Sequence, residues 1–188
     1  MPRWRPIWIL ILVILVPLGA CQESQPDQQL VQEPRGELSV ESSAFQHGNI
    51  IPQRYTCDGE DASPPLSWSE PPPGTAGLVL VVDDPDAPAG TWVHWVLFNI
   101  PVETRGLEDG VPALQQVESV GVQGHNGWGN LGYGGPCPPP GAPHRYHFKL
   151  YALDTTLELD AGASKGDVEK AMAGHILAEG QLIGQYGR

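Results

Sequence analysis

The chain has 188 residues, 40% of them hydrophobic, and a formal net charge of −12. This length allows one domain of ordinary size whose core does not depend on disulfides or metals. The strongly negative charge argues against a nucleic-acid partner, because nucleic acids are bound through clustered Lys and Arg.

The N-terminus has the pattern of an export signal. Two arginines precede an apolar run over residues 7–16, and small residues then lead to Cys21. The apolar run is too short to cross about 30 Å of hydrocarbon at about 1.5 Å per residue, so a permanent membrane span is the weaker interpretation. Residues 18–21 resemble the bacterial lipobox, which implies cleavage before Cys21 and its acylation. An ordinary secretory signal with an incidental cysteine is the alternative.

A polar segment follows the cysteine. Residues 22–36 are rich in Gln, Glu and Pro and cannot bury enough apolar surface to compensate for the entropy lost on ordering. We therefore expect a lipoprotein signal over residues 1–20, the lipidated cysteine and a flexible tether over 21–37, and one domain over 38–188. Gln22 is typical of sorting to an outer membrane if the cell has two, so we expect an exported protein held at the cell envelope by its lipid anchor.

The domain contains short apolar runs separated by many of the 23 glycines and 20 prolines, which predicts an all-β sandwich. Residues 78–82 form a β-branched apolar run typical of a central strand covered on both faces, ended by Asp83 and Asp84. Prolines and a glycine predict a loop over residues 84–90.

Two further strands are predicted, over residues 92–100 and 146–153. Strict alternation along the first would place five residues on one face, namely Trp92, His94, Val96, Phe98 and Ile100. A glycine- and proline-rich loop over residues 132–143 precedes the second strand.

A short amphipathic helix is predicted near the C-terminus. Ser164 and Asp167 form a helix-start signature, and apolar residues continue at helical spacing from Val168 to Ile176.

Ionisable and glycine residues gather where these loops meet the strands. If the two central strands are neighbours, Asp84 and His94 lie at the same end of the sheet and can form an ion pair or a hydrogen bond. The amides of Gly134 and Gly135 can point at an anion from the glycine-rich loop. With His144 and Tyr146, these groups predict a donor-rich cavity that suits phosphate.

The chain resembles the phosphatidylethanolamine-binding protein family, in its bacterial and archaeal branch often described as Raf kinase inhibitor-like. The most specific motifs are Asp84-Pro85-Asp86-Ala87-Pro88, His94-Trp95, Gly135-Pro136-Cys137-Pro138-Pro139 and His144-Arg145-Tyr146. The similarity extends from Phe45 to Tyr186, so only the signal and the tether fall outside it.

The resemblance implies an antiparallel β-sandwich with a few short peripheral helices and a small anion pocket at one end. It implies a phosphate-like anion or a phospholipid head group as the ligand, and no cofactor, metal or catalysis. The implied ligand-binding residues are Asp84, Asp86, His94, Gly135, Pro136, His144 and Tyr146. Among these Asp86 has a supporting position, and Arg145 is assigned to structural pairing.

Several alternatives stay open. His94 can be a core histidine, and His94, His144 and Asp84 can together ligate a metal. A hydrolase that uses the Asp and His side chains is a second function. Inhibition of a protease or kinase through a surface near the pocket is a third. Cys57 and Cys137 form either a disulfide, as expected of an exported domain, or two buried thiols.

Overall fold

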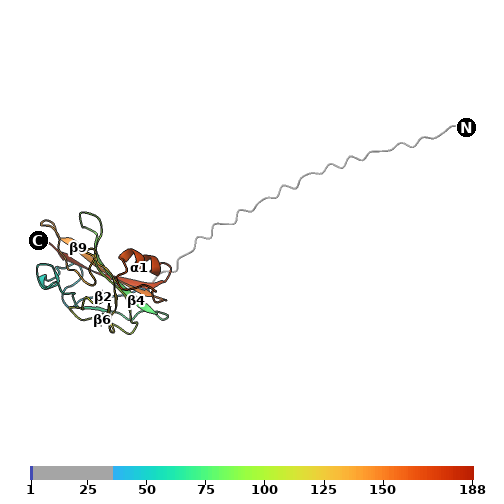
Figure 1. Ribbon diagram of the computed structural model, residues 1–188, viewed down its shortest axis with the longest axis horizontal. Coiled ribbons are helices and arrows are strands. Elements are labelled where there is room, and N and C mark those ends of the chain that lie inside the picture. Colours follow the sequence, from blue (N-terminus) through green and yellow to red (C-terminus); the bar gives the residue numbers. More distant parts are fainter. Residues whose placement is uncertain (2–35) are drawn as a thin grey trace. The chain divides into compact units, whose positions relative to one another are not determined.

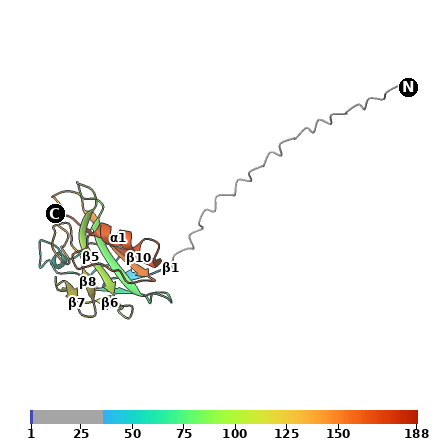
Figure 2. The ribbon, with the colours of Figure 1, turned by 45° about the vertical axis from the view of Figure 1, so that its right-hand side comes forward.

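The computed structural model describes Met1 and residues 36–188; the predicted signal, Cys21 and nearly all of the predicted tether lie outside the described residues. Residues 36–188 form two β-sheets (Figures 1 and 2). In spatial order, the larger sheet contains β1 (Gly36–Glu37), β10 (Ile176–Tyr186), β9 (His144–Leu153), β4 (Gly77–Asp84), β5 (Trp92–Ile100), β8 (Gly121–Gln123) and β7 (Gln116–Val117). The smaller sheet contains β2 (Val40–Glu41), β3 (Leu66–Trp68) and β6 (Gly106–Leu107).

The prediction of a mainly β, largely antiparallel sandwich is confirmed. The pairs β10–β9, β9–β4 and β4–β5 are all antiparallel, whereas the two-residue strand β1 runs parallel to its neighbour β10. The main core fills the space between the sheets, where Leu80, Phe148 and Leu150 of the larger sheet pack in one cluster with Leu66 and Leu107 of the smaller one. Burial of this apolar surface is the main force that holds the two layers together.

The other face of the larger sheet is covered by helix α1 (Lys165–Met172). Val168 and Met172 pack there against Val79, Val81 and Phe98 of the central strands. Besides α1, the described residues contain a short 3-10 helix, η1 (Gln53–Tyr55). Within residues 36–188, no helix has the length and hydrophobicity needed to cross a bilayer.

The predicted start of α1 is confirmed and its predicted end is wrong. Ser164 accepts a hydrogen bond from the Asp167 N–H and the Asp167 carboxylate accepts one from the Ser164 N–H, which is a complete capping box. The helix stops at Met172 because Ala173 is extended and Gly174 has a φ of +86°. Ile176 begins strand β10 instead of ending the helix.

Strand β5 has the predicted bounds, but its predicted alternation is wrong because the strand contains two β-bulges. Asp83 pairs with Val93 and Val82 with Trp95, so His94 is an extra residue with no partner on β4. The second irregularity lies near Asn99, whose φ is +52°. As a result Val96 and Phe98 face α1, whereas Trp95, Leu97 and Ile100 face the smaller sheet.

Adjacent acidic residues at the end of β4 serve opposite faces of the sheet. Asp83 is fully buried and forms ion pairs with Lys149 at 2.8 Å and Lys165 at 2.6 Å, which joins β9 and α1 to the strand. Asp84, the next residue, lies on the other face and faces the cavity described below. Asp83 is therefore structural, whereas Asp84 is available to a functional site.

Candidate functional site

A cavity of about 370 Å³ opens at the end of the larger sheet where β4 ends and β5 and β9 begin. We call it the site cavity. Its polar lining consists of Asp84, His94, His144 and Tyr146. Its apolar lining consists of residues 87–89 and 137–139, Trp92 and Trp128. The structure therefore brings four of the seven predicted ligand-binding residues into one concave site.

His144 is oriented by a carboxylate. Its Nδ1 lies 2.8 Å from Oδ2 of Asp84, and both side chains are largely buried. The other carboxylate oxygen of Asp84 accepts a hydrogen bond of 2.8 Å from the Asp86 N–H, which fixes Asp84 in turn. Because Nδ1 of His144 donates to Asp84, Nε2 is the ring nitrogen left for a ligand. His144 is the first residue of β9, two residues before the predicted start of that strand.

His94 is held by the backbone instead. Its Nδ1 lies 2.6 Å from the carbonyl oxygen of Gly134, and the residue is only 3% exposed. The ring meets Tyr146 and Trp128 edge to face, with centroids 5.1 and 5.2 Å apart. Burial lowers the pKa of His94, although the Gly134 carbonyl and the Asp84 carboxylate favour its charged form.

Tyr146 brings an unpaired hydroxyl to the site. Its OH is buried and has no hydrogen-bond partner among the described residues. Burial and the nearby carboxylates of Asp84 and Asp86 raise the pKa of Tyr146, so the hydroxyl keeps its proton. A buried polar atom without a partner is uncommon, and this one can donate to a ligand in the site cavity.

The expectation that glycine amides point at an anion is wrong for this structure. The Gly134 N–H donates to the carbonyl oxygen of His94 at 2.9 Å. The Gly135 N–H donates to Oδ1 of Asp61 at 2.7 Å. Both amides are used to hold the loop, and neither Gly135 nor Pro136 is part of the cavity lining in the described chain.

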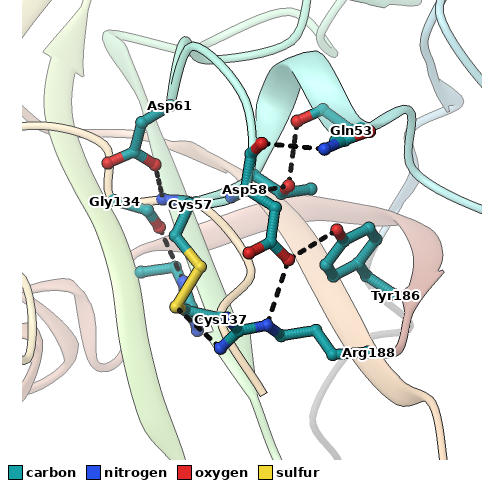
Figure 3. Close-up of a disulfide and its surroundings, with 11 residues drawn as sticks. Gln53, Cys57, Asp58, Asp61, Gly134, Cys137, Tyr186 and Arg188 are labelled. Atoms are coloured by element: carbon teal, nitrogen blue, oxygen red, sulfur yellow. Dashed lines mark hydrogen bonds and ion pairs between the residues drawn. A yellow bond between two sulfur atoms is a disulfide. The ribbon is translucent and has the colours of Figure 1, made fainter. Parts of the chain in front are cut away.

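A disulfide fastens the same loop to the segment after η1 (Figure 3). Cys57 and Cys137 are bonded, with Cα atoms 5.4 Å apart, so the structure has the first of the two alternatives that the sequence left open. The Cys57 N–H also donates to the Pro136 carbonyl oxygen at 3.1 Å. Asp61, which sequence reasoning missed, receives the Gly135 amide from the same segment. These contacts position Cys137 and the prolines that follow it against the site cavity.

The C-terminus is tied to this region through Asp58. Its Oδ2 accepts a hydrogen bond of 2.8 Å from the Tyr186 hydroxyl and lies 3.1 Å from Nε of Arg188 (Figure 3). The end of β10 is thereby linked to the disulfide-bonded segment.

Asp86 and Arg145 form a structural pair at the edge of the site. The Asp86 carboxylate accepts from the Arg145 backbone N–H and from Nε and one terminal nitrogen of its guanidinium, at 2.7 to 2.9 Å. The structural pairing assigned to Arg145 is confirmed. Asp86 does not line the cavity but joins the loop after β4 to the start of β9.

Residues 124–129 continue along β5 after β8 ends at Gln123. The Gly124 and Gly127 amides donate to carbonyl oxygens of β5, and the Asn126 carboxamide accepts from the Trp128 and Asn130 amides. This network places Trp128, which is 47% exposed, at the rim of the site cavity.

Neither a metal cluster nor the larger groove competes with this site. Within residues 36–188, no three His, Cys, Asp or Glu side chains are grouped so as to hold a metal ion. A groove of about 710 Å³ runs beside β9 and β10, but its lining includes Glu37, Glu41 and Glu179. Three carboxylates disfavour an anion there, so the smaller site cavity is the better candidate.

Comparisons with known proteins agree with this architecture. The family model of phosphatidylethanolamine-binding protein matches residues 41–187. The UPF0098 protein of Methanothermobacter thermautotrophicus is 54% identical over 151 residues, which is 80% of this chain and 99% of that protein. The UPF0098 protein of Aquifex aeolicus is 49% identical over 153 residues, covering 80% and 89% of the two chains.

Two crystal structures are also similar. The Chlamydia trachomatis protein CT736, described as a homologue of phosphatidylethanolamine-binding protein, superposes with a TM-score of 0.74 at 40% identity over 81% of this chain and 99% of its own. Escherichia coli YbcL, described as a member of the mammalian family, gives the same TM-score and coverage at 32% identity. The chain belongs to the phosphatidylethanolamine-binding protein family.

Proposed function

We propose that this protein is a binding protein whose site cavity takes a small anion of phosphate chemistry, present either as a free phosphate group or in a phospholipid head group. One observation carries the proposal: two imidazoles and an unpaired buried hydroxyl line the same cavity. Each imidazole has its Nδ1 bonded to the protein, which leaves Nε2 for a ligand. The apolar remainder of the lining lowers the local dielectric constant, which strengthens such contacts.

The affinity of this site falls as the pH rises. A phosphate oxygen accepts hydrogen bonds, so the fully ionised ligand needs imidazole nitrogens that carry protons. Burial lowers the pKa of His94 below its ordinary value of 6.5, and an anion in the cavity counteracts that shift. Binding therefore takes up protons and is tightest in mildly acidic solution.

Calorimetric titration of the full chain with inorganic phosphate tests the proposal. Binding is expected for the native chain and is expected to be lost in His94→Ala. His47→Ala, at an exposed residue beside the larger groove, is the control and should bind as the native chain does. Undiminished binding by His94→Ala would remove the site assignment.

We propose further that the cavity is not catalytic. The Asp84–His144 pair is arranged like a general base. Among residues 36–188, however, no serine or threonine lines the cavity, and its cysteine is held in a disulfide. Incubation with phosphoester and carboxylester substrates should give no turnover above the background rate. Turnover that disappears in His144→Ala would establish a hydrolase instead.

Lipid anchoring at Cys21 is the third part of the proposal. The motif before Cys21 and the polar segment after it support an exported lipoprotein at the cell envelope, on the outer membrane or its periplasmic side if the cell has two membranes. The full chain expressed with radiolabelled palmitate should incorporate the label and partition into detergent. Cys21→Ser should do neither; label that persists in this variant would contradict the anchor.

A further inference from the structure

The backbone fixes which nitrogen of His94 carries a proton. A carbonyl oxygen can only accept, so the 2.6 Å contact with Gly134 requires the proton on Nδ1. This contact uses Nδ1 and leaves Nε2 as the ring nitrogen for a ligand. In the neutral ring, Nε2 is therefore an acceptor with no proton to donate.

The surroundings of His94 keep the ring neutral near pH 7. The residue is 3% exposed, and no lysine or arginine belongs to the lining of the site cavity in the described chain. Two carboxylates act on the ring, from Asp84 on β4 and Asp61 on the loop side, and the backbone at Gly134 and Gly135 also favours its charged form. Burial outweighs these groups and lowers the pKa of His94.

The other groups that face a ligand have different hydrogen-bonding roles. On β9, the unpaired Tyr146 hydroxyl can donate, and Nε2 of His144 is left for the ligand because Nδ1 is bonded to Asp84. Trp128, which contacts the His94 ring from the rim, has no ionisable group. The cavity thus combines a donor from β9 with an acceptor from β5.

We propose that the site cavity selects phosphate groups that carry a proton, which are free phosphate and phosphomonoesters, over phosphodiesters such as intact phospholipid head groups. This inference rests on the proposed anion site. A monoester loses its second proton near pH 6, so near that pH many molecules keep a P–OH that can donate to Nε2 of His94. A diester has no such proton and must place a bare oxygen against the lone pair of Nε2 or force a proton onto a buried ring.

Two probes that carry the same amine but differ in the esterification of the phosphate test the inference. Phosphorylethanolamine is a monoester, and glycerophosphorylethanolamine carries the same amine on a diester. Calorimetric titration of the full chain at pH 6 should give an affinity at least about tenfold higher for the monoester, the effect expected of one buried hydrogen bond. The monoester affinity should fall about tenfold per pH unit well above pH 6, because one proton is bound with the ligand.

The outcomes separate this inference from the proposed function. Equal affinity for the two probes, or tighter binding of the diester, overturns the selectivity and leaves the anion site in place. Failure of both probes and of inorganic phosphate to bind overturns the anion site, and the selectivity with it.

A variant assigns the selectivity to His94. In His94→Gln the carboxamide can turn its NH₂ group towards the ligand and donate to a diester oxygen, so the monoester-to-diester affinity ratio should fall towards one. His144→Ala removes a ring nitrogen that both probes contact and should weaken both while leaving the ratio unchanged. If His94→Gln kept the monoester-to-diester affinity ratio of the unmodified chain, and its circular dichroism spectrum showed that it was folded, the role of His94 would be overturned. The comparison of the two probes on the native chain does not depend on how either variant folds.

Discussion

Asp84 binds His144 and not His94: the carboxylate lies 2.8 Å from Nδ1 of His144, whereas Nδ1 of His94 is bonded to the Gly134 carbonyl oxygen. Two imidazoles in one cavity thus have partners of different charge. We therefore expect the two histidines to contribute differently to anion binding, with His94 responding to the protonation state of the ligand.

The first prediction concerns the Asp84–His144 pair. His144→Gln should weaken phosphate binding by about tenfold or more, because the ring nitrogen that Asp84 orients for the ligand is lost. His175 provides a matched control, since its Nδ1 also lies 2.8 Å from a carboxylate, that of Asp154, and it is outside the site cavity. Calorimetry at pH 6 should show native affinity in His175→Gln. Similar losses in the two variants would mean that the cavity histidine has no special role.

The second prediction concerns the loop beside the cavity. A Cβ atom on Gly135 would lie 2.6 Å from both the Asp61 carboxylate and the Tyr55 carbonyl oxygen, so Gly135→Ala must displace the loop. Phosphate affinity and the thermal midpoint should both fall.

Gly166→Ala in α1 is the control for this substitution. Its Cβ would meet nothing closer than 3.8 Å, and alanine should stabilise the helix by roughly 0.5–1 kcal/mol relative to glycine. If Gly135→Ala bound phosphate like the native chain, the loop would not position the site.

The third prediction concerns the disulfide. Cys57 and Cys137 are 80 positions apart, and a link across a loop of this length typically stabilises a small exported domain by about 2–5 kcal/mol. Cys57→Ser with Cys137→Ser should lower the urea midpoint accordingly and weaken phosphate binding, since Cys137 belongs to the cavity lining. A thiol assay on the chain without substitutions, unfolded in the absence of reductant, should detect neither Cys57 nor Cys137. An unchanged urea midpoint in the double variant would contradict the prediction.

The fourth prediction concerns the pH dependence of stability. Hydrogen bonds from Arg145 hold the pKa of Asp86 well below its ordinary value of 3.8. The folded protein takes up this proton less readily than the unfolded chain, so the pair stabilises the fold above pH 3.8 and the contribution is lost as the pH falls below that value. Asp86→Asn should therefore lower the thermal midpoint at pH 7, and its difference from the native chain should shrink below pH 3.8.

Glu70 is the control for the fourth prediction. It is a carboxylate whose side chain is 84% exposed and lies 3.8 Å from Arg105, so Glu70→Gln should leave the midpoint nearly unchanged. A difference between Asp86→Asn and the native chain that stays constant from pH 7 to pH 3 would show that Asp86 acts through something other than its charge.

Local sequence patterns predicted much of the fold. They failed for elements whose structure depends on contacts between residues far apart in the sequence. The bounds of β5 and the capped start of α1 depend on neighbouring residues and were predicted correctly. Strand β10 was missed because its glycines suggest turns. In the structure Gly180 and Gly184 instead allow close approach of other segments: a Cβ there would lie 2.0 Å from the Leu38 carbonyl oxygen and 2.5 Å from the Ile51 side chain.

The candidate site was predicted in its residue types but not in its hydrogen bonds. Asp84, His94, His144 and Tyr146 meet in one cavity, as the motifs implied. The partner of each imidazole could not be predicted, because it depends on the direction of a backbone carbonyl and on the bulge at His94. Asp61 was missed for a similar reason, since it reaches Gly135 across 74 positions of sequence.

Each bulge of β5 reverses the alternation of the strand, and the second reversal cancels the first. His94 and Ile100 thus lie on the same side of the sheet, although the residues between them face the opposite sides from those that strict alternation would give. A related chain that lost Asn99 alone would have to turn either Ile100 out of the core or the imidazole out of the cavity. The spacing along this strand is therefore constrained by the proposed ligand site as well as by packing, and insertions or deletions within it should occur only in compensating pairs.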